Sequence, residues 1–248
     1  MGLRCSREFC DRSVTRLFGF SRTGAICTLD YDKNTENDRP NGSCNGYSSA
    51  ATIVWDPVNT ATTESDIITA GTLHVSSNSA SGADQTINGV TFTGQAGGPL
   101  GSNAAGTFYT TGSGSNTTGS VSLDALLDSH SYSVGAGPVT FDITGLNIGD
   151  TYQIQIIAVG DTRGCCNTRV QSFSGDGTTY SGDLSRNDPA SVVGTFVADG
   201  ATQTIFVNGP TDPGLSGFQV RNITPIPEPS ALLLAGLSGL SFLIRRRK

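Results

Sequence analysis

The sequence predicts an all-β protein whose main domain is an antiparallel β-sandwich or jelly roll. Short runs of alternating apolar and polar residues, separated by turn residues, fill residues 51–222. Glycine accounts for 32 of the 248 residues and charged residues for only 15%, a composition typical of extracellular β proteins with long turns. No long helical period separates the runs, so consecutive strands are expected to pack directly against one another.

The first runs predict three strands, because side chains that alternate along a strand point to opposite faces of its sheet. "ATIVW" at residues 51–55 begins the domain, and "PVTFDITGL" at 138–146 and "TYQIQIIAV" at 151–159 follow. The residues expected together on the buried faces of the last two strands are Val139, Phe141, Ile143, Tyr152, Ile154 and Ile156.

Three more strands are expected near the end of the domain. "VVGTFVADG" at residues 192–200 and "ATQTIFVNG" at 201–209 form a pair, and "SGFQVRNI" at 216–223 supplies a closing strand. The single helical candidate, "SLDALLDSH" at 122–130, is too short to change the fold class.

The charge distribution divides the chain into three parts. Residues 1–50 form an irregular N-terminal segment, residues 51–224 the sandwich and residues 225–248 a C-terminal tail. The sandwich carries 14 acidic and 4 basic side chains, for a net charge of −10, and its cations are Arg163, Arg169, Arg186 and Arg221. Because so few cations cannot neutralise a row of phosphates, nucleic acid is excluded as a partner.

The tail combines an apolar stretch with a cationic end. Residues 231–244 contain no charged side chain, and as a helix they would extend about 21 Å, short of the roughly 30 Å hydrocarbon core of a bilayer. Prolines at 225, 227 and 229 separate them from the sandwich. The tail is predicted to enter the membrane, with its cationic cluster on the cytoplasmic side. That cluster is Arg245, Arg246, Arg247 and Lys248.

Pro227, Glu228 and Pro229, followed by the apolar stretch and the cationic cluster, resemble the PEP-CTERM sorting signal of Gram-negative bacteria. The resemblance implies that an exosortase, a sorting enzyme embedded in the membrane, recognises the Pro-Glu-Pro motif and removes the tail. It further implies transit through the inner membrane by way of residues 231–244, and delivery to the cell surface or the extracellular matrix. The alternative is an ordinary C-terminal anchor that stays uncut.

The sandwich also resembles a domain that recurs in PEP-CTERM proteins and looks like a galactose-binding-like jelly roll. The resemblance rests on the order of short stretches that span most of residues 51–222, and it implies no established common activity. These stretches are "NGVTFTG" at 88–94, "GLNIGDTYQIQ" at 145–155, "DTR" at 161–163, "VVGTFVADGATQTI" at 192–205 and "LSGFQVR" at 215–221.

Residues 1–50 lack the apolar core that a signal peptide needs; their most apolar stretch is "LFGF" at 17–20. Two explanations stay open: another export route, or a start region altered by a misassigned start codon or a frameshift, which we favour. Small residues at 48–50 offer a signal peptidase site directly before the first strand. Four of the six cysteines lie in this segment, so only the adjacent Cys165 and Cys166, which can close a vicinal disulfide, belong to the sandwich.

The sandwich offers no recognisable catalytic constellation. His74 and His130 are the only histidines of the chain, and Glu64 is the only glutamate of the sandwich. A triad of a serine, His130 and Asp124 or Asp128 can be written down, but the G-x-S-x-G elbow is missing. We therefore predict no catalytic residue, no metal site and no cofactor, while calcium held by loop aspartates stays open as a structural ion.

The leading hypothesis is a noncatalytic surface or matrix protein that is exported, sorted by an exosortase and mixed into extracellular polysaccharide. The first alternative is a carbohydrate-binding module, since jelly rolls often bind sugars on aromatic platforms. Trp55 and Tyr180 are the candidates for such a platform, with Tyr109 and Tyr132 as further amphipathic rings. The place of Trp55 in the first strand favours a role in the core instead. An extracellular hydrolase is the second alternative.

Overall fold

The computed structural model describes the backbone and side chains of most of the second unit of the chain. The chain divides into two units, Met1–Ser49 and Ala50–Lys248. Side chains are described for residues 50–79, 83–94, 114–158, 160–161 and 163–225, and the backbone alone for residues 18–20, 26–30, 41–44, 104–106 and 110–113. In the first unit, β1 (Phe18–Phe20), β2 (Ile26–Asp30) and β3 (Asn41–Cys44) form an antiparallel sheet in the order β1-β2-β3.

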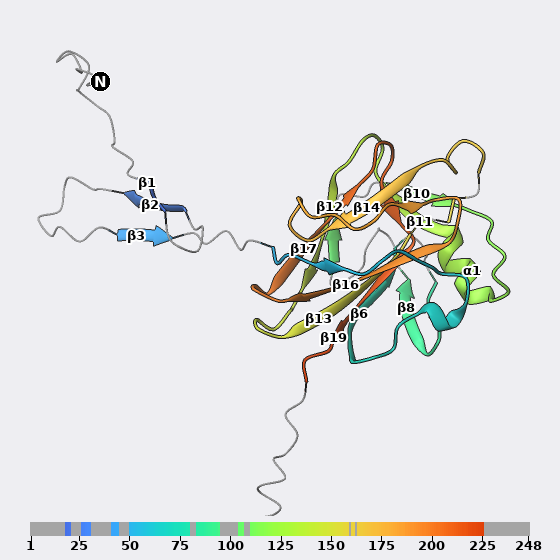
Figure 1. The fold of residues 1–248 in the computed structure, drawn as a ribbon, viewed down its shortest axis with the longest axis horizontal. Helices are drawn as coiled ribbons and strands as arrows, with labels where there is room; N and C mark the ends of the chain where they lie inside the picture. Colours follow the sequence, from blue (N-terminus) through green and yellow to red (C-terminus); the bar gives the residue numbers. More distant parts are fainter. Residues whose placement is uncertain are drawn as a thin grey trace, which may run out of the picture. The chain divides into compact units, whose positions relative to one another are not determined.

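The second unit is a sandwich whose larger sheet has eight strands. They are β4 (Val54–Trp55), β5 (Asn59–Thr60), β6 (Thr72–Asn78), β7 (Gln85–Ile87), β8 (Val90–Gly94), β13 (Thr151–Ile157), β16 (Ala190–Val197) and β19 (Gly217–Asn222). Their order is β4-β16-β13-β19-β6-β8-β7, with β5 paired to β16. The strand β19, which the sequence predicts as the closing strand, therefore lies in the middle of this sheet (Figure 1).

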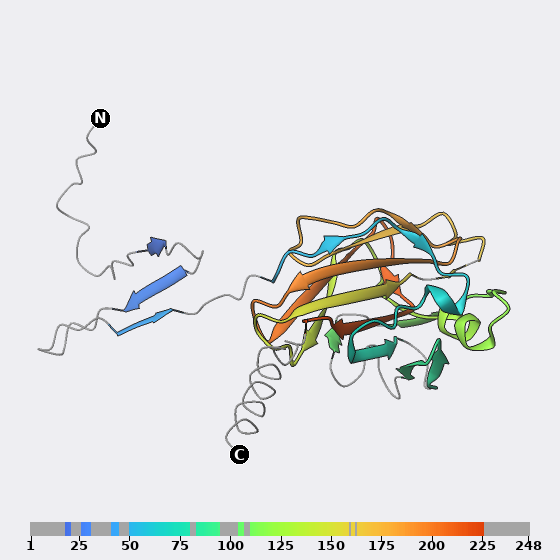
Figure 2. The same ribbon diagram turned by 60° about the horizontal axis from the view of Figure 1, so that its bottom comes forward.

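The second sheet faces the first across the core (Figure 2). Its order is β15-β14-β17-β12-β9, and its strands are β9 (Ala104–Gly106), β12 (Val139–Thr144), β14 (Val170–Ser174), β15 (Leu184–Ser185) and β17 (Thr202–Asn208). A small third sheet has the order β10-β11-β18 and consists of β10 (Thr110–Ser113), β11 (Ser129–Tyr132) and β18 (Gly214–Leu215).

Nearly all of these strand pairs are antiparallel, which confirms the predicted fold class. The exception is β6, which pairs with β8 in parallel through Ser77 and Asn78. The β7–β8 hairpin turns at Asn88 and Gly89, whose φ angles of 49° and 74° are both positive. A two-residue type I′ turn requires this conformation, and the Asn-Gly sequence is the usual way to supply it.

The core lies between the two sheets and uses the alternating side chains that the sequence predicts. Phe141 and Ile143 point into it from β12, and Tyr152 and Ile154 point into it from β13, all at most 1% exposed. The ring of Phe141 lies 4.9 Å from that of Phe218 in β19, so the two sheets interlock through aromatic side chains. Full burial of one such side chain contributes about 2 kcal/mol to folding.

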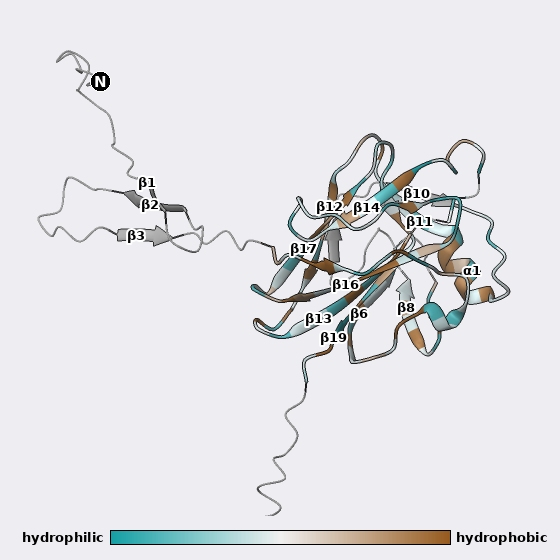
Figure 3. Cartoon of the chain, in the orientation of Figure 1, coloured by the Kyte–Doolittle hydropathy of each residue, from teal (hydrophilic) through white to brown (hydrophobic). Residues whose placement is uncertain are grey.

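A second apolar cluster covers the other face of the larger sheet. The helix α1 (Val121–Asp128) packs Leu123 and two further leucines against Phe92 of β8 and Ile157 of β13. Ser120 caps the helix, because its hydroxyl accepts a hydrogen bond from Leu123 N at 3.3 Å. Figure 3 shows hydrophobic residues (brown) gathered in α1 and in the strands of the sandwich. The predicted short helix is therefore confirmed.

Long polar side chains on this same face hold irregular backbone against the sheet. The 3₁₀ turn η1 (Glu64–Asp66) is followed by residues 67–71, which form no strand. Gln155 Nε2 donates to Asp66 O at 2.6 Å, and Gln219 Nε2 donates to Ile68 O at 3.0 Å. Arg221 donates to the carbonyl oxygens of residues 69, 70 and 71 at 2.8, 2.7 and 2.9 Å. These bonds replace the strand partners that the segment lacks.

The described part of the chain contains no helix long and apolar enough to cross a membrane. The membrane helix that the sequence predicts at residues 231–244 lies outside the described residues. It therefore stays a prediction.

Candidate functional site

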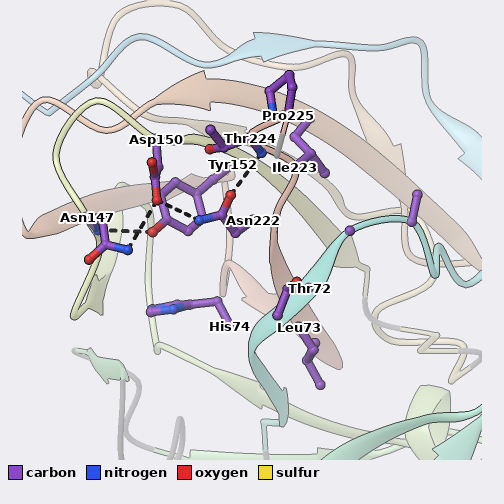
Figure 4. A pocket seen from close by; sticks show the side chains of 12 residues that line it. Thr72, Leu73, His74, Asn147, Asp150, Tyr152, Asn222, Ile223, Thr224 and Pro225 are labelled. Carbon is purple, nitrogen blue, oxygen red and sulfur yellow. Dashed lines mark hydrogen bonds between the residues drawn. The ribbon is translucent and has the colours of Figure 1, made fainter. Parts of the chain in front are cut away.

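An open cleft of about 760 Å³ lies at one end of the three central strands of the larger sheet. Asn222, the last residue of β19, is paired with Tyr152 of β13 on one side and with Thr72 of β6 on the other. Because both neighbours run antiparallel to β19, their first residues lie beside its end. The lining comes from residues 70–74, from Asn147, Asp150 and Tyr152, and from residues 222–225 (Figure 4).

Gly71 brings the first wall of the cleft close to the end of β19. Its φ angle is +79°, a backbone conformation that residues with a side chain rarely adopt. A Cβ atom at this position would lie 2.5 Å from Asn222 O. Glycine is therefore required for residues 70–72 to pass this close to β19.

Amide and carboxylate groups fix the opposite wall. Asp150 Oδ2 accepts hydrogen bonds from Asn147 Nδ2 at 3.1 Å and from Asn222 Nδ2 at 2.7 Å. Asn222 Oδ1 accepts from Thr224 N at 2.9 Å, and Thr224 Oγ1 accepts from Thr151 N at 2.8 Å. Figure 4 shows these side chains converging from two segments that are far apart in the sequence.

Two rings form the floor of the cleft. The ring of His74 meets that of Tyr152 edge to face, with centroids 5.6 Å apart. His74 Nε2 donates to Thr144 O at 2.9 Å, and Tyr152 Oη accepts from Asn147 N at 3.0 Å. Tyr152 in turn stacks on Phe196 of the core, and this contact fixes the position of the Tyr152 ring.

Most residues that line the cleft are polar, and one of them is a carboxylate. Glycoside hydrolysis requires two carboxyl groups on either side of the scissile bond, whereas Asp150 is the one carboxylate among the residues that line the cleft. Its Oδ2 atom already accepts two amide hydrogen bonds. Amides, a carboxylate and an imidazole around an open cleft are suited to the hydroxyl groups of a sugar.

The sequence-predicted site residues lie elsewhere. Pro227, Glu228, Pro229 and the cationic cluster are outside the described residues, and so is Tyr109. Trp55 is half-buried against the core, where a Cβ atom on Gly194 would lie 2.6 Å from its ring. Tyr180 is half-buried and forms an isolated bridge with Ser174. Neither lines the cleft.

The triad that can be written from the sequence is not assembled around His130. Asp128 Oδ1 accepts from Asn116 Nδ2 at 2.6 Å, and Asp124 Oδ1 accepts from Thr118 Oγ1 at 2.7 Å. His130 itself is fully buried, and its ring nitrogens have no hydrogen-bond partner within the described residues. Its imidazole instead faces a carboxylate that the sequence did not single out, with Nε2 4.0 Å from Asp161 Oδ2.

Cys165 and Cys166 are joined in a vicinal disulfide. Cys165 is exposed and Cys166 is buried. As for metals, no three His, Cys, Asp or Glu side chains within the described ranges come together as ligands of an ion.

Comparison with known families identifies the tail. The model of the PEP-CTERM protein-sorting motif matches residues 225–248, directly after the sandwich. Fold and tail together define an exported β-sandwich protein. The chain carries a PEP-CTERM sorting motif, which indicates secretion through the membrane, sorting to the cell surface and processing by an exosortase-type enzyme.

Comparison with curated proteins found no match, whereas three solved structures resemble parts of the chain. A calcium-binding mutant of Bacteroides uniformis β-glucuronidase 2 aligns over 60% of this chain and 18% of its own, at 15% identity and a TM-score of 0.44. A family GH115 4-O-methyl-α-glucuronidase with specificity for decorated arabinogalactans aligns over 54% and 19%, at 9% identity and a TM-score of 0.31. The ANXUR2 extracellular domain from Arabidopsis thaliana aligns over 64% and 52%, at 13% identity and a TM-score of 0.31. The chain thus spans between about a fifth and a half of these proteins.

Proposed function

We propose that this protein is a noncatalytic surface or matrix protein of a Gram-negative bacterium, mixed into extracellular polysaccharide after sorting. The observation that carries the proposal is the PEP-CTERM motif at residues 225–248, attached to a β-sandwich. An exosortase-type enzyme recognises Pro227, Glu228 and Pro229 while residues 231–244 are held in the inner membrane. The cationic end stays on the cytoplasmic side, and cleavage then releases the sandwich.

The noncatalytic role is supported by how the carboxylates of the sandwich are used. Glu64 accepts from Ser120 Oγ at 2.6 Å and so ties η1 to the cap of α1. Asp176 Oδ1 accepts from Thr178 N and Thr179 N, at 2.8 and 2.7 Å, and closes a turn. These two carboxylates have structural partners, and neither lines the cleft.

Sorting is tested by the substitution Glu228→Ala in a host that has an exosortase. The variant is expected to accumulate at full length in the inner membrane, because the sorting enzyme no longer recognises the Pro-Glu-Pro turn. The exposed Asp183 provides the matched control, since Asp183→Ala removes an acidic group from the sandwich. Fractionation and the size of the chain on a gel give the result. Arrival of a shortened Glu228→Ala chain at the surface would contradict the proposal.

The cleft favours carbohydrate binding as a second candidate function. Its amide and carboxylate groups and the imidazole of His74 line the open cleft at one end of the sandwich. A glycan array with the full chain is expected to show saturable binding. Asp150→Asn should weaken it about tenfold by removing a charged acceptor of hydroxyl hydrogen bonds.

The control for this experiment is Asp183→Asn, which makes the same chemical change on an exposed aspartate outside the cleft. It is expected to bind like the unaltered chain. Loss of binding in Tyr180→Ala or Trp55→Ala, but not in Asp150→Asn, would place the sugar at the aromatic residues that the sequence predicts. If the chain binds no glycan on the array, carbohydrate binding is contradicted and the first proposed function is unaffected.

A further inference from the structure

Three of the four arginines of residues 51–224 meet around one small pocket, which we call the arginine pocket. It has a volume of about 150 Å³. Its lining consists of Tyr132, Arg163, Cys166, Arg169, Arg186 and Asp212. The fourth arginine, Arg221, is engaged with backbone carbonyls beneath the cleft. The acidic sandwich thus gathers most of its cations in one place.

Backbone hydrogen bonds connect the segments that carry these arginines. Cys166 N donates to Arg163 O at 2.9 Å, and Arg169 N donates to Cys166 O at 3.2 Å. Arg186 N donates to Arg169 O at 3.0 Å, while Arg186 O accepts from Asp161 N at 2.8 Å. The main chain therefore fixes the spacing of the arginines before any ligand arrives, which lowers the entropic cost of binding.

The charges around the pocket do not cancel. Arg163 donates two hydrogen bonds to Asp161, from Nε at 2.7 Å and from Nη2 at 2.6 Å. Arg169 Nη1 lies 2.7 Å from Asp212 Oδ2. Arg186 instead donates from Nη2 to the uncharged backbone oxygen of Asp212. Three cations therefore face two carboxylates, and Arg186 has no carboxylate partner among the described residues.

Arg186 is the arginine of the pocket that forms no direct ion pair within the described residues. It is 1% exposed, and its Nε has no hydrogen-bond partner within the part of the chain that the structure describes. Burial and the nearby Arg169 lower its pKa to about 10, and the charges of Asp161 and Asp212 partly oppose this shift, so the guanidinium still carries its charge at pH 7. A buried charge without a direct ion pair is costly, and a bound anion would offset this cost.

We infer that the arginine pocket binds the carboxylate of an acidic sugar. A carboxylate matches the planar fork of a guanidinium, and such paired hydrogen bonds are among the strongest in proteins. The pocket has room for about five water molecules at roughly 30 Å³ each, so it accepts a carboxylate and part of one ring. Tyr132 and Cys166 supply the less polar wall that a sugar ring requires. The choice of a sugar rests on the proposed function in extracellular polysaccharide, whereas the anion site rests on the pocket alone.

Titration calorimetry on the full chain tests this inference with D-glucuronate, D-glucose and acetate as probes. Glucuronate is expected to bind at least about tenfold more tightly than glucose, which lacks the charge, and than acetate, which lacks the ring. Arg169→Gln should weaken glucuronate binding about tenfold, and Arg169→Lys should weaken it less, because lysine keeps the charge without the fork. Arg169 is partly exposed, and Asp212 keeps its hydrogen bond from Gly135 N at 2.8 Å, so these variants are expected to fold.

Val197→Glu is the matched control, because it changes the net charge by the same amount as Arg169→Gln. Val197 is 54% exposed and pairs with Thr151, at the end of β13 away from Asp161. The Val197→Glu variant should bind glucuronate with the same affinity as the unaltered chain. Equal binding of glucuronate and glucose, equal binding of glucuronate and acetate, or an undiminished Arg169→Gln variant would each overturn the inference. Arg169→Gln should still reach the cell surface, so failure here is distinct from failure of the sorting proposal.

Discussion

His130 is a buried imidazole that folding keeps neutral. Burial lowers its pKa from 6.5 to about 4, Asp161 partly opposes this shift, and Arg186 and Arg163 reinforce it. Asp161 itself would be driven to a higher pKa by burial, but its hydrogen bonds from Arg163 outweigh this effect and lower the pKa. The chain therefore holds a neutral histidine next to an ionised carboxylate.

We expect this histidine to make stability depend on pH. Between pH 4 and pH 6.5 the unfolded chain binds more protons at His130 than the folded chain does, so the free energy of unfolding should rise with pH. The contribution amounts to about 3 kcal/mol and is fully present above pH 6.5. Urea unfolding of the unaltered chain and of His130→Phe across this range measures it. The variant should give the flatter profile, and parallel profiles would contradict the expectation.

Arg221 holds a segment of irregular backbone against the sandwich. Its three bonds to the carbonyls of residues 69, 70 and 71 place one wall of the cleft. Arg221→Met should lower the free energy of unfolding by about 3 kcal/mol, because charge-assisted bonds are lost and the carbonyls lose their donors. Leu73→Ala is the control. Leu73 is 39% exposed and pairs with Arg221 across β6 and β19. This variant should lower the free energy of unfolding by less than about 1 kcal/mol. Equal losses in urea unfolding would contradict this role.

At the scale of elements, the strands that the sequence predicts are those with a clean apolar face. β12, β13, β16, β17 and β19 alternate in this way, and each is found where it is expected. β6 was not predicted, because Ser76, Ser77 and Asn78 are polar and yet buried. Ser76 compensates by donating to Thr91 O at 2.6 Å. Polar strands of this kind are stabilised by partners distant in the sequence, so no local period reveals them.

The cleft and the arginine pocket were hidden from sequence reasoning for a related reason. Asp150 stands in "GDT", which the sequence indicates as a turn, and only the register of β13 and β19 brings it to Asn222. The sequence shows that arginines such as Arg163, Arg169 and Arg186 are scarce, but their meeting depends on backbone hydrogen bonds between separate segments. The composition signalled that these arginines are few, and the fold determines where they gather.

The disulfide-bearing turn is expected to fold without its disulfide. The bond between Cys165 and Cys166 closes the smallest loop that two cysteines can form, so it removes little entropy from the unfolded chain. The turn also has backbone hydrogen bonds, including one that Asn167 N donates to Arg163 O at 3.1 Å. Replacing both cysteines by serine should therefore lower the melting temperature by no more than about 4 °C. Calorimetry on the double variant checks this, and a much larger drop would show that the disulfide organises the turn.

At the scale of the whole molecule, the second unit begins at Ala50, and the next residue, Ala51, already forms hydrogen bonds within the sandwich. Ala51 N donates to Gln203 Oε1 at 2.9 Å, and Gln203 Nε2 donates back to Ala51 O at 3.2 Å. Ile53 is 1% exposed in the core, and β4 then pairs with β16. Residues 51–55 are therefore part of the sandwich, whereas the first unit ends at Ser49.

Two truncations test this boundary. Removing residues 1–49 should leave the melting temperature of the sandwich within about 2 °C, because all described core residues are kept. Removing residues 1–55 deletes Ile53, β4 and the bonds to Gln203, and loss of one buried aliphatic side chain alone costs about 3 kcal/mol. The second truncation should therefore lower the melting temperature by at least about 6 °C. Differential scanning calorimetry on both chains decides the point. If the shorter deletion were as damaging as the longer one, the first unit would contribute to the stability of the sandwich, and the boundary at Ser49 would be contradicted.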